Sequence, residues 1–181
     1  MRLPAQTGFT VVELMISIVV AAVLLALASP SFVEFTKNRR ITAQANEFVS
    51  TLSLARSEAL KRVSRVTVCA SSNGTSCTGG WNQGYLVFND DNNNGSVDGG
   101  ESILKVVSAL AGANTLNGIT GTVASYVSYV SSGHSKLTSG AFQSGSIALC
   151  DDRGVSHGRA ITVNVTGRVR VESTEPTSCA L

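Results

Sequence analysis

The chain has 181 residues, a formal net charge of +2, and 43% hydrophobic and 14% charged residues. About 40 residues form an N-terminal segment that is distinct from the rest of the chain. The remaining residues are enough for one domain of ordinary size with a modest hydrophobic core. The net charge is only mildly basic. Net charge alone therefore does not indicate an anionic partner such as nucleic acid.

The first apolar segment runs from Phe9 to Ala28, and Glu13 is its one ionisable residue. A helix of this length spans about 30 Å, the thickness of the hydrocarbon core of a bilayer. A carboxylate inside such a segment costs on the order of 3 kcal/mol, and it indicates a partner or a function. The segment therefore predicts a membrane-spanning helix in which the charge of Glu13 must be neutralised.

Residues 1–8, MRLPAQTG, contain one arginine and no acid, and no small-residue cleavage site follows the apolar run. We therefore expect cleavage after Gly8, which gives Phe9 a new α-amino group. Phe9 and Glu13 are one helical turn apart, so the amine of the same chain or of a neighbouring copy can pair with the carboxylate. The alternative is a plain signal anchor with an accidental glutamate.

The sequence from Gly8 to Leu14, followed by an apolar helix and Pro30, resembles the leader and N-terminal stalk of type IV pilins and type II secretion pseudopilins. The resemblance implies removal of the leader, residues 1–8, by a prepilin peptidase, N-methylation of Phe9, and pairing of Glu13 with the Phe9 amine of an adjacent subunit. It also implies a bacterial inner membrane protein with a periplasmic domain. After assembly with other pilins or pseudopilins, such a protein lies in a pilus at the cell surface.

Residues 31–63 contain neither glycine nor proline, and apolar residues recur at steps of three and four. This spacing predicts an amphipathic helix whose apolar stripe packs on the globular domain. The stripe consists of Ile41, Ala45, Phe48, Leu52, Ala55, Ala59 and Val63. Because Pro30 can kink a helix without ending it, we expect one kinked helix, with 9–36 as the transmembrane or filament stalk and 37–63 as the amphipathic half.

After Val63 the pattern changes to short segments of alternating polarity separated by glycine-rich turns. These segments predict strands within RVTVCAS, GYLVFN, ESILKVVSAL, TVASYVSYVSS, GSIALCD, RAITVNV and RVRVE. One helix packed on predominantly antiparallel sheets is an α+β fold, with residues 64–181 as the β-rich globular domain. This arrangement resembles the pseudopilin H and FimT/FimU branch, in which LARSEALKR at 54–62 and GYLVFNDDNNNGSVDGGE at 84–101 look like the branch's own motifs.

Four cysteines, Cys69, Cys77, Cys150 and Cys179, all follow the apolar segment. In a chain exported to an oxidising compartment, an even number of cysteines indicates disulfides. Three pairings are possible, and the neighbouring residues favour Cys69 with Cys77 and Cys150 with Cys179. A zinc site is the alternative, although the spacings contain no CxxC pair.

The acidic stretch from Asp90 to Glu101 fits the twelve-residue pattern of a calcium loop. The oxygen ligands in this pattern are Asp90, Asn92, Asn94, Ser96, Asp98 and Glu101, and Gly95 permits the sharp turn. The flanks read as strands rather than as the two helices of an EF-hand, and Asx-Gly clusters build hairpin turns without a metal. The stretch therefore leaves two interpretations open, a calcium site and a hairpin turn, and calcium is the one cofactor that the sequence suggests.

The sequence Gly167-Arg168-Val169-Arg170-Val171 predicts a strand with Arg168 and Arg170 on one exposed face, about 7 Å apart, and the two valines in the core. Two exposed guanidinium groups form a phosphate-binding pair. The arrangement resembles the C-terminal motif of FimT-type minor pilins, which implies DNA binding. Further basic residues that we expect to widen the patch are Arg159, Arg153 and Lys136. The alternative is a solvated edge strand whose charges block aggregation.

No catalytic constellation is recognisable, and both histidines lie in Gly- and Ser-rich segments, so we expect neither an enzyme nor a small-molecule substrate. Two functions remain. The first is a minor pilin of a type IV pilus that takes part in pilus biogenesis and in DNA binding and uptake during natural transformation. The second is a structural subunit without DNA binding, either a pilus-priming minor pilin or a type II secretion pseudopilin H.

Overall fold

The computed structural model describes residues 8–179, and for residues 27–30 it describes the backbone alone. The chain divides into two compact units, Met1–Arg39 and Arg40–Leu181. One helix, α1 (Val11–Arg62), begins in the first unit and ends in the second. Its N-terminal part is long and apolar enough to cross a membrane.

Helix α1 begins after Thr10, whose side-chain hydroxyl accepts a hydrogen bond of 3.2 Å from the N–H of Glu13. Threonine is a favoured N-cap residue because its oxygen satisfies an N–H group that has no partner within the helix. Glu13 stands in the first turn, where a negative charge is favourable to the helix dipole. The sequence around Glu13 thus also defines where the helix starts.

The second half of α1 buries the apolar stripe that the sequence predicts. Six of its members, from Ile41 to Ala59, are at most 2% exposed. The prediction for Val63 is wrong, because the helix ends at Arg62 and Val63 is 76% exposed with a φ of +55°. Val63 occupies the left-handed position that commonly follows a helix end.

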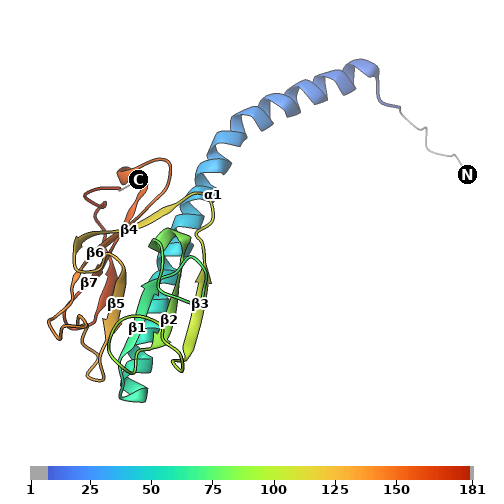
Figure 1. Ribbon diagram of the computed structural model, residues 1–181. Coiled ribbons are helices and arrows are strands. Elements are labelled where there is room, and N and C mark those ends of the chain that lie inside the picture. The colour runs from blue at the N-terminus through green and yellow to red at the C-terminus, as the bar shows by residue number, and fades with distance from the viewer. Residues whose placement is uncertain (1–7, 180–181) are drawn as a thin grey trace, which may run out of the picture. The chain divides into compact units, whose positions relative to one another are not determined.

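The globular unit contains two four-stranded antiparallel sheets (Figure 1). The first sheet has the order β3-β2-β1-β5 and consists of β1 (Val66–Ala70), β2 (Gly84–Asn89), β3 (Ile103–Ser108) and β5 (Tyr126–Tyr129). The second has the order β4-β6-β7-β8 and consists of β4 (Thr115–Gly121), β6 (Gly145–Cys150), β7 (Arg159–Val163) and β8 (Val169–Val171). The predicted α+β fold is confirmed.

Strand β4 is the one strand of these sheets that the sequence did not predict. Its sequence, TLNGITG, contains an asparagine and two glycines, which favour a turn. The tertiary structure overrides that preference, because Leu116 is buried in the core and β4 pairs with β6 along its whole length.

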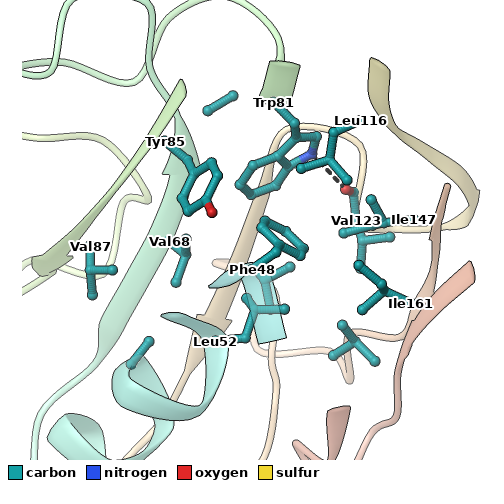
Figure 2. Close-up of a cluster of buried hydrophobic side chains, with 14 of the residues drawn as sticks. Phe48, Leu52, Val68, Trp81, Tyr85, Val87, Leu116, Val123, Ile147 and Ile161 are labelled. Atoms are coloured by element: carbon teal, nitrogen blue, oxygen red, sulfur yellow. Dashed lines mark hydrogen bonds between the residues drawn. The ribbon is translucent and has the colours of Figure 1, made fainter. Parts of the chain in front are cut away.

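The core lies between α1 and the two sheets (Figure 2). The Phe48 ring of α1 makes edge-to-face contacts with Trp81 and Tyr85, with centroid distances of 5.4 and 5.1 Å. The indole N–H of Trp81 donates a hydrogen bond of 3.2 Å to the carbonyl oxygen of Val123. Burial raises the pKa of the Tyr85 phenol, so this side chain remains neutral at physiological pH.

The cysteines form the two favoured disulfides, Cys69–Cys77 and Cys150–Cys179, with Cα–Cα distances of 5.5 and 6.0 Å. The first disulfide closes the loop after β1, and the second joins the end of β6 to the C-terminal segment. All four thiols are oxidised, so no thiolate remains for the alternative zinc site.

Candidate nucleic-acid interface

The hairpin between β7 and β8 has a three-residue loop, 165–167, and the Gly-Arg-Val-Arg sequence begins at the last residue of this loop, Gly167. The N–H of Gly167 donates to the carbonyl of Asn164 at 2.8 Å, and the N–H of Asn164 donates to the carbonyl of Arg168 at 3.0 Å. Gly167 has a φ of +75°, the left-handed conformation that such loops require at their last position. A Cβ atom at Gly167 would also overlap the carbonyl oxygen of Gly133, so only glycine fits.

Helix α1 fixes this hairpin through the guanidinium group of Arg56. Its Nε donates a hydrogen bond to the carbonyl of Gly133, and its Nη2 donates one to the carbonyl of Thr166, both at 2.9 Å. A planar guanidinium group can donate in two directions at once, which suits it to joining two loops. The backbone that precedes Arg168 is therefore held by residues outside the hairpin.

The register of the second sheet defines the face on which the arginines lie. Arg170 pairs with Thr162, and Thr162 pairs with Ser146, so these three side chains project from the same outer face. Arg168 and Arg170 are exposed, and neither guanidinium group has a hydrogen-bond or ion-pair partner within residues 8–179. The two arginines thus offer ten N–H donors in total to a ligand.

The two valines of the motif behave differently from each other. Val169 is partly buried and packs against the core, as the sequence predicts. Val171 pairs with fully buried Ile161 and so lies on the core side of β8, as the sequence predicts, but it is 39% exposed. The reason is that β8 is a three-residue strand at the edge of its sheet, where the core no longer covers its last residue.

Of the other predicted basic residues, Lys136 shares the outer face with the two arginines. Ser135, its neighbour, is fully buried and contacts the strand end at Asn164 through its hydroxyl, so the Lys136 side chain points the opposite way. Lys136 faces Phe142 in an antiparallel bridge. The nearest acid in sequence is Glu172, which follows the end of β8 two residues after Arg170.

Arg159 and Arg153 do not extend this face, which corrects the expectation from sequence. Arg159 lies at the opposite end of β7, five residues from Asn164 and so about 17 Å away, and its position in the alternation matches that of buried Ile161. Arg153 forms an ion pair with Asp151 at 2.7 Å, with side chains 14% and 5% exposed. Burial raises the pKa of the Asp151 carboxyl, but the hydrogen bonds and charge of Arg153 outweigh that effect and lower it.

The predicted calcium ligands lie in one loop, but the side-chain oxygens of five of the six accept hydrogen bonds from the loop itself, and Asp90 also accepts one from β1. Asp90 is fully buried, and its carboxylate accepts from the Thr67 hydroxyl at 2.8 Å and from the N–H groups of Asn94 and Gly95 at 3.0 and 3.1 Å. Glu101 accepts from the N–H groups of Asp91 and Asp98, both at 3.0 Å.

Asp98, in the middle of the loop, accepts hydrogen bonds from the side-chain amides of Asn92 and Asn94 at 2.7 and 2.6 Å. These bonds lower the pKa of the Asp98 carboxyl. Within the described residues, no group of three or more Cys, His, Asp or Glu side chains is arranged to hold a metal ion. Calcium binding stays a prediction, and an increased melting temperature at millimolar calcium would support it.

The predicted processing and assembly residues lie at the start of α1. Gly8 and Phe9 precede the helix, and the Phe9 side chain is 80% exposed. The Glu13 carboxylate accepts no hydrogen bond from another described residue. The leader residues 1–7 lie outside the described part of the chain.

Two residues near the arginines were missed from sequence. Arg56 lies within the LARSEALKR motif, but its bonds to residues 77 and 110 positions away gave no local sign of its role. Phe142 lies between the predicted strand segments 122–132 and 145–151, outside any predicted element, and it is 58% exposed. The one feature of the sequence that could have indicated Phe142 is that it is a single aromatic residue between Gly-rich turns.

Comparisons with known proteins agree with the fold. The sequence model of the family described as Type II transport protein GspH matches residues 44–167, and that of the prokaryotic N-terminal methylation motif matches residues 3–29. No match was found among curated proteins.

Among solved structures, the chain is similar to the type IV minor pilin FimU of Pseudomonas aeruginosa in two crystal forms. The TM-scores are 0.60 and 0.56 at 20% and 18% identity, and the matches cover 81% and 77% of this chain and 99% of FimU in each case. It is also similar to the minor pseudopilin EpsH from the Type 2 Secretion System of Vibrio cholerae, at 13% identity and a TM-score of 0.50, over 74% of this chain and 96% of EpsH. These matches show a shared fold, and the family match over residues 44–167 shows that the chain belongs to the GspH family of minor pilins and pseudopilins.

Proposed function

We propose that the chain is a type IV minor pilin that binds DNA through the outer face of its second sheet and serves in DNA uptake. The observation that carries this proposal is the pair Arg168 and Arg170, two exposed guanidinium groups without a partner among the described residues. Guanidinium groups pair with phosphate oxygens in a bidentate manner. Lys136, on the same face, adds a third positive charge.

The N-terminal part of the proposal concerns assembly. A prepilin peptidase removes residues 1–8, Phe9 is N-methylated, and the Glu13 carboxylate pairs with the Phe9 amine of a neighbouring subunit. The methylation motif that matches residues 3–29 and the apolar start of α1 support this route. The chain is then anchored in the inner membrane, with its globular unit in the periplasm, until it enters a filament at the cell surface.

DNA binding is tested with the full-length chain in detergent and a fluorescent DNA duplex at low salt. We expect the Arg168→Gln, Arg170→Gln variant to bind roughly 10-fold more weakly, because two phosphate contacts are lost. The matched control is Arg40→Gln, Arg159→Gln, which removes the same charge. Arg40 lies about 24 Å along α1 from Arg56, so this control should stay within about two-fold of the wild type.

Two results would refute the DNA proposal: no binding of the wild type at low salt, or equal weakening by both double variants. The assembly proposal has a separate test, mass spectrometry of the chain recovered from its native host. We expect a mature chain that begins at N-methylated Phe9, and a chain that retains residues 1–8 would contradict it.

The second candidate is a purely structural subunit, such as pseudopilin H of a type II secretion system. The description of the matching family and the fold shared with EpsH favour this function. It requires no nucleic-acid face, so the DNA measurement above distinguishes the two candidates.

A further inference from the structure

A short segment, 134–136, is inserted between the diverging ends of β6 and β7. The N–H of Ser135 donates to the carbonyl of Val165 at 3.3 Å, and the N–H of Gln143 donates to the carbonyl of Ser135 at 3.0 Å. Ser135 and Gln143 are both fully buried. The inserted segment therefore extends the second sheet beyond the ends of β6 and β7, and residues next to Ser135 and Gln143 in sequence point outward.

Several large hydrophobic side chains are exposed in the described part of the globular unit. Phe142 is the one aromatic residue among them, and it is 58% exposed. The Lys136 ammonium group lies 5.4 Å from the centroid of its ring, within the range of a cation–π contact. The centroid of the His134 ring lies 6.1 Å from the centroid of the Phe142 ring. The phenyl ring thus has a positively charged ammonium group and an imidazole ring beside it, and more than half of its surface remains accessible.

The Phe142 ring projects from the same face as the two arginines. Along the chain, exposed Phe142 and half-buried Ser144 and Ser146 alternate with buried Gln143 and Ile147, so the even-numbered side chains point outward. Ser146 pairs with Thr162, and Thr162 pairs with Arg170, which places Arg170 outward as well. One continuous outer face therefore combines an accessible aromatic ring with Lys136, Arg168 and Arg170.

A face of this kind distinguishes single-stranded from double-stranded nucleic acid. Arginine and lysine side chains bind the phosphates of either form. In a duplex the base faces are covered by their neighbours, whereas an unpaired base can stack on an aromatic side chain. Cationic groups beside the ring add favourable contacts with the adjacent phosphates.

We propose that Phe142 is a stacking platform for an unpaired base, with the flanking phosphates bound by Lys136, Arg168 and Arg170, so that the chain prefers single-stranded DNA. This inference rests on the proposed DNA binding and specifies its substrate class. Base stacking on an aromatic residue raises affinity roughly 10-fold per base, and the preference for the single strand should be of this size.

The test measures fluorescence anisotropy of the full-length chain in detergent with three probes of equal length: a single strand, its duplex, and a single strand with abasic sites. Phe142→Leu keeps an apolar side chain and removes the aromatic ring, whereas Phe142→Trp keeps a ring. Val165→Ala, at a 41% exposed residue of the neighbouring turn, controls for apolar surface. Melting curves of each variant verify folding.

We expect Phe142→Leu to weaken single-strand binding roughly 10-fold and duplex binding less than about two-fold, and Phe142→Trp to retain the wild-type preference. The wild type should bind the abasic strand as weakly as Phe142→Leu binds the intact strand. Unchanged single-strand binding by Phe142→Leu, or equal weakening for the duplex, would overturn the stacking platform. If that occurs while Arg168→Gln, Arg170→Gln still weakens both probes, only the platform fails. If the arginine variant weakens neither probe, the proposed DNA binding itself fails.

Discussion

Two turns of the globular unit use their charged side chains in opposite ways. In the loop from Asp90 to Glu101, the carboxylates accept hydrogen bonds from the loop's own N–H groups and amides. In the turn from Asn164 to Arg168, the backbone is held by Arg56 and by close contact with Gly133. The first turn satisfies its charged side chains internally, and the second leaves Arg168 and Arg170 without partners among the described residues.

The difference shows that a charged motif is available to a ligand when other residues hold its backbone. Backbone N–H and C=O groups must find partners in either case. Where the side chains of the motif supply those partners, their charge stabilises the fold, and where a distant residue supplies them, the charge remains exposed. The following variants measure this contrast from the largest expected effect to the smallest.

The largest effect should come from Gly167→Ala. The new methyl group meets the carbonyl of Gly133 and also forces alanine into a left-handed conformation, so we expect a loss of about 3 kcal/mol in the free energy of unfolding. Gly140→Ala is the matched control, because Gly140 has a φ of +88° and open space around it, and it should cost about 1 kcal/mol. Urea unfolding measures both, and equal losses would show that the turn does not pack tightly on Gly133.

Asp90→Asn should lower the free energy of unfolding by a smaller amount. This variant tests the loop from Asp90 to Glu101, whose carboxylates accept hydrogen bonds from the loop itself. The amide NH₂ group would replace an acceptor that faces N–H and hydroxyl donors in a fully buried position, so we expect a cost of about 2.5 kcal/mol. Asp91→Asn, at an exposed neighbour, should cost about 0.5 kcal/mol. A neutral outcome for Asp90→Asn in the same unfolding assay would mean that the carboxylate does not organise the loop.

The contact from outside the turn is tested by Arg56→Ala. Two hydrogen bonds from a charged donor are lost, and we expect the free energy of unfolding to fall by about 2 kcal/mol, with weaker DNA binding because Arg168 is no longer positioned. Arg62→Ala, which removes a partly exposed ion pair with Glu58 on the same helix, should change the free energy of unfolding much less than Arg56→Ala does. If the DNA affinity of Arg56→Ala equals that of the wild type, Arg56 stabilises the turn but does not position Arg168 for DNA binding.

The smallest effect concerns the titration of Asp98. Because Asn92 and Asn94 donate hydrogen bonds to its carboxylate, the pKa of Asp98 is lower in the folded chain than in the unfolded one. Its contribution to stability is therefore present above the ordinary value of about 3.9 and is lost as the pH falls through the folded pKa. NMR titration should show this lowered pKa, and Asn92→Ala with Asn94→Ala should return it toward the ordinary value. An Asp98 that titrates normally in the wild type would contradict the hydrogen-bonded loop.

Local patterns explain which elements were predictable. The stripe from Ile41 to Ala59 follows helical spacing, and the alternation around β1, β6 and β7 follows strand spacing, so both appear in the sequence. The positions of the cysteines favoured one of the three possible disulfide pairings, because Cys69 and Cys77 enclose a short loop. Strand β4 was not predictable in the same way, because its partner β6, and not its own composition, makes it a strand.

The candidate site was predictable only in its charges. Arg168 and Arg170 stand out in a short motif, whereas the roles of Arg56, Gly133 and Phe142 depend on contacts between distant parts of the chain. Arg153 and Arg159 were expected to widen the patch. In the structure Arg153 lies in an ion pair with Asp151, and Arg159 lies at the end of β7 opposite to the turn.

The most direct test of the DNA-binding face is the salt dependence of affinity. Each lost phosphate contact reduces the slope of log K against log salt concentration by about 0.9 on duplex DNA, so Arg168→Gln, Arg170→Gln should reduce its magnitude by about 2. The control Arg40→Gln, Arg159→Gln should leave the slope unchanged. If both double variants give the wild-type slope, the two arginines do not contact phosphate, and the outer face of the second sheet is not the DNA-binding surface.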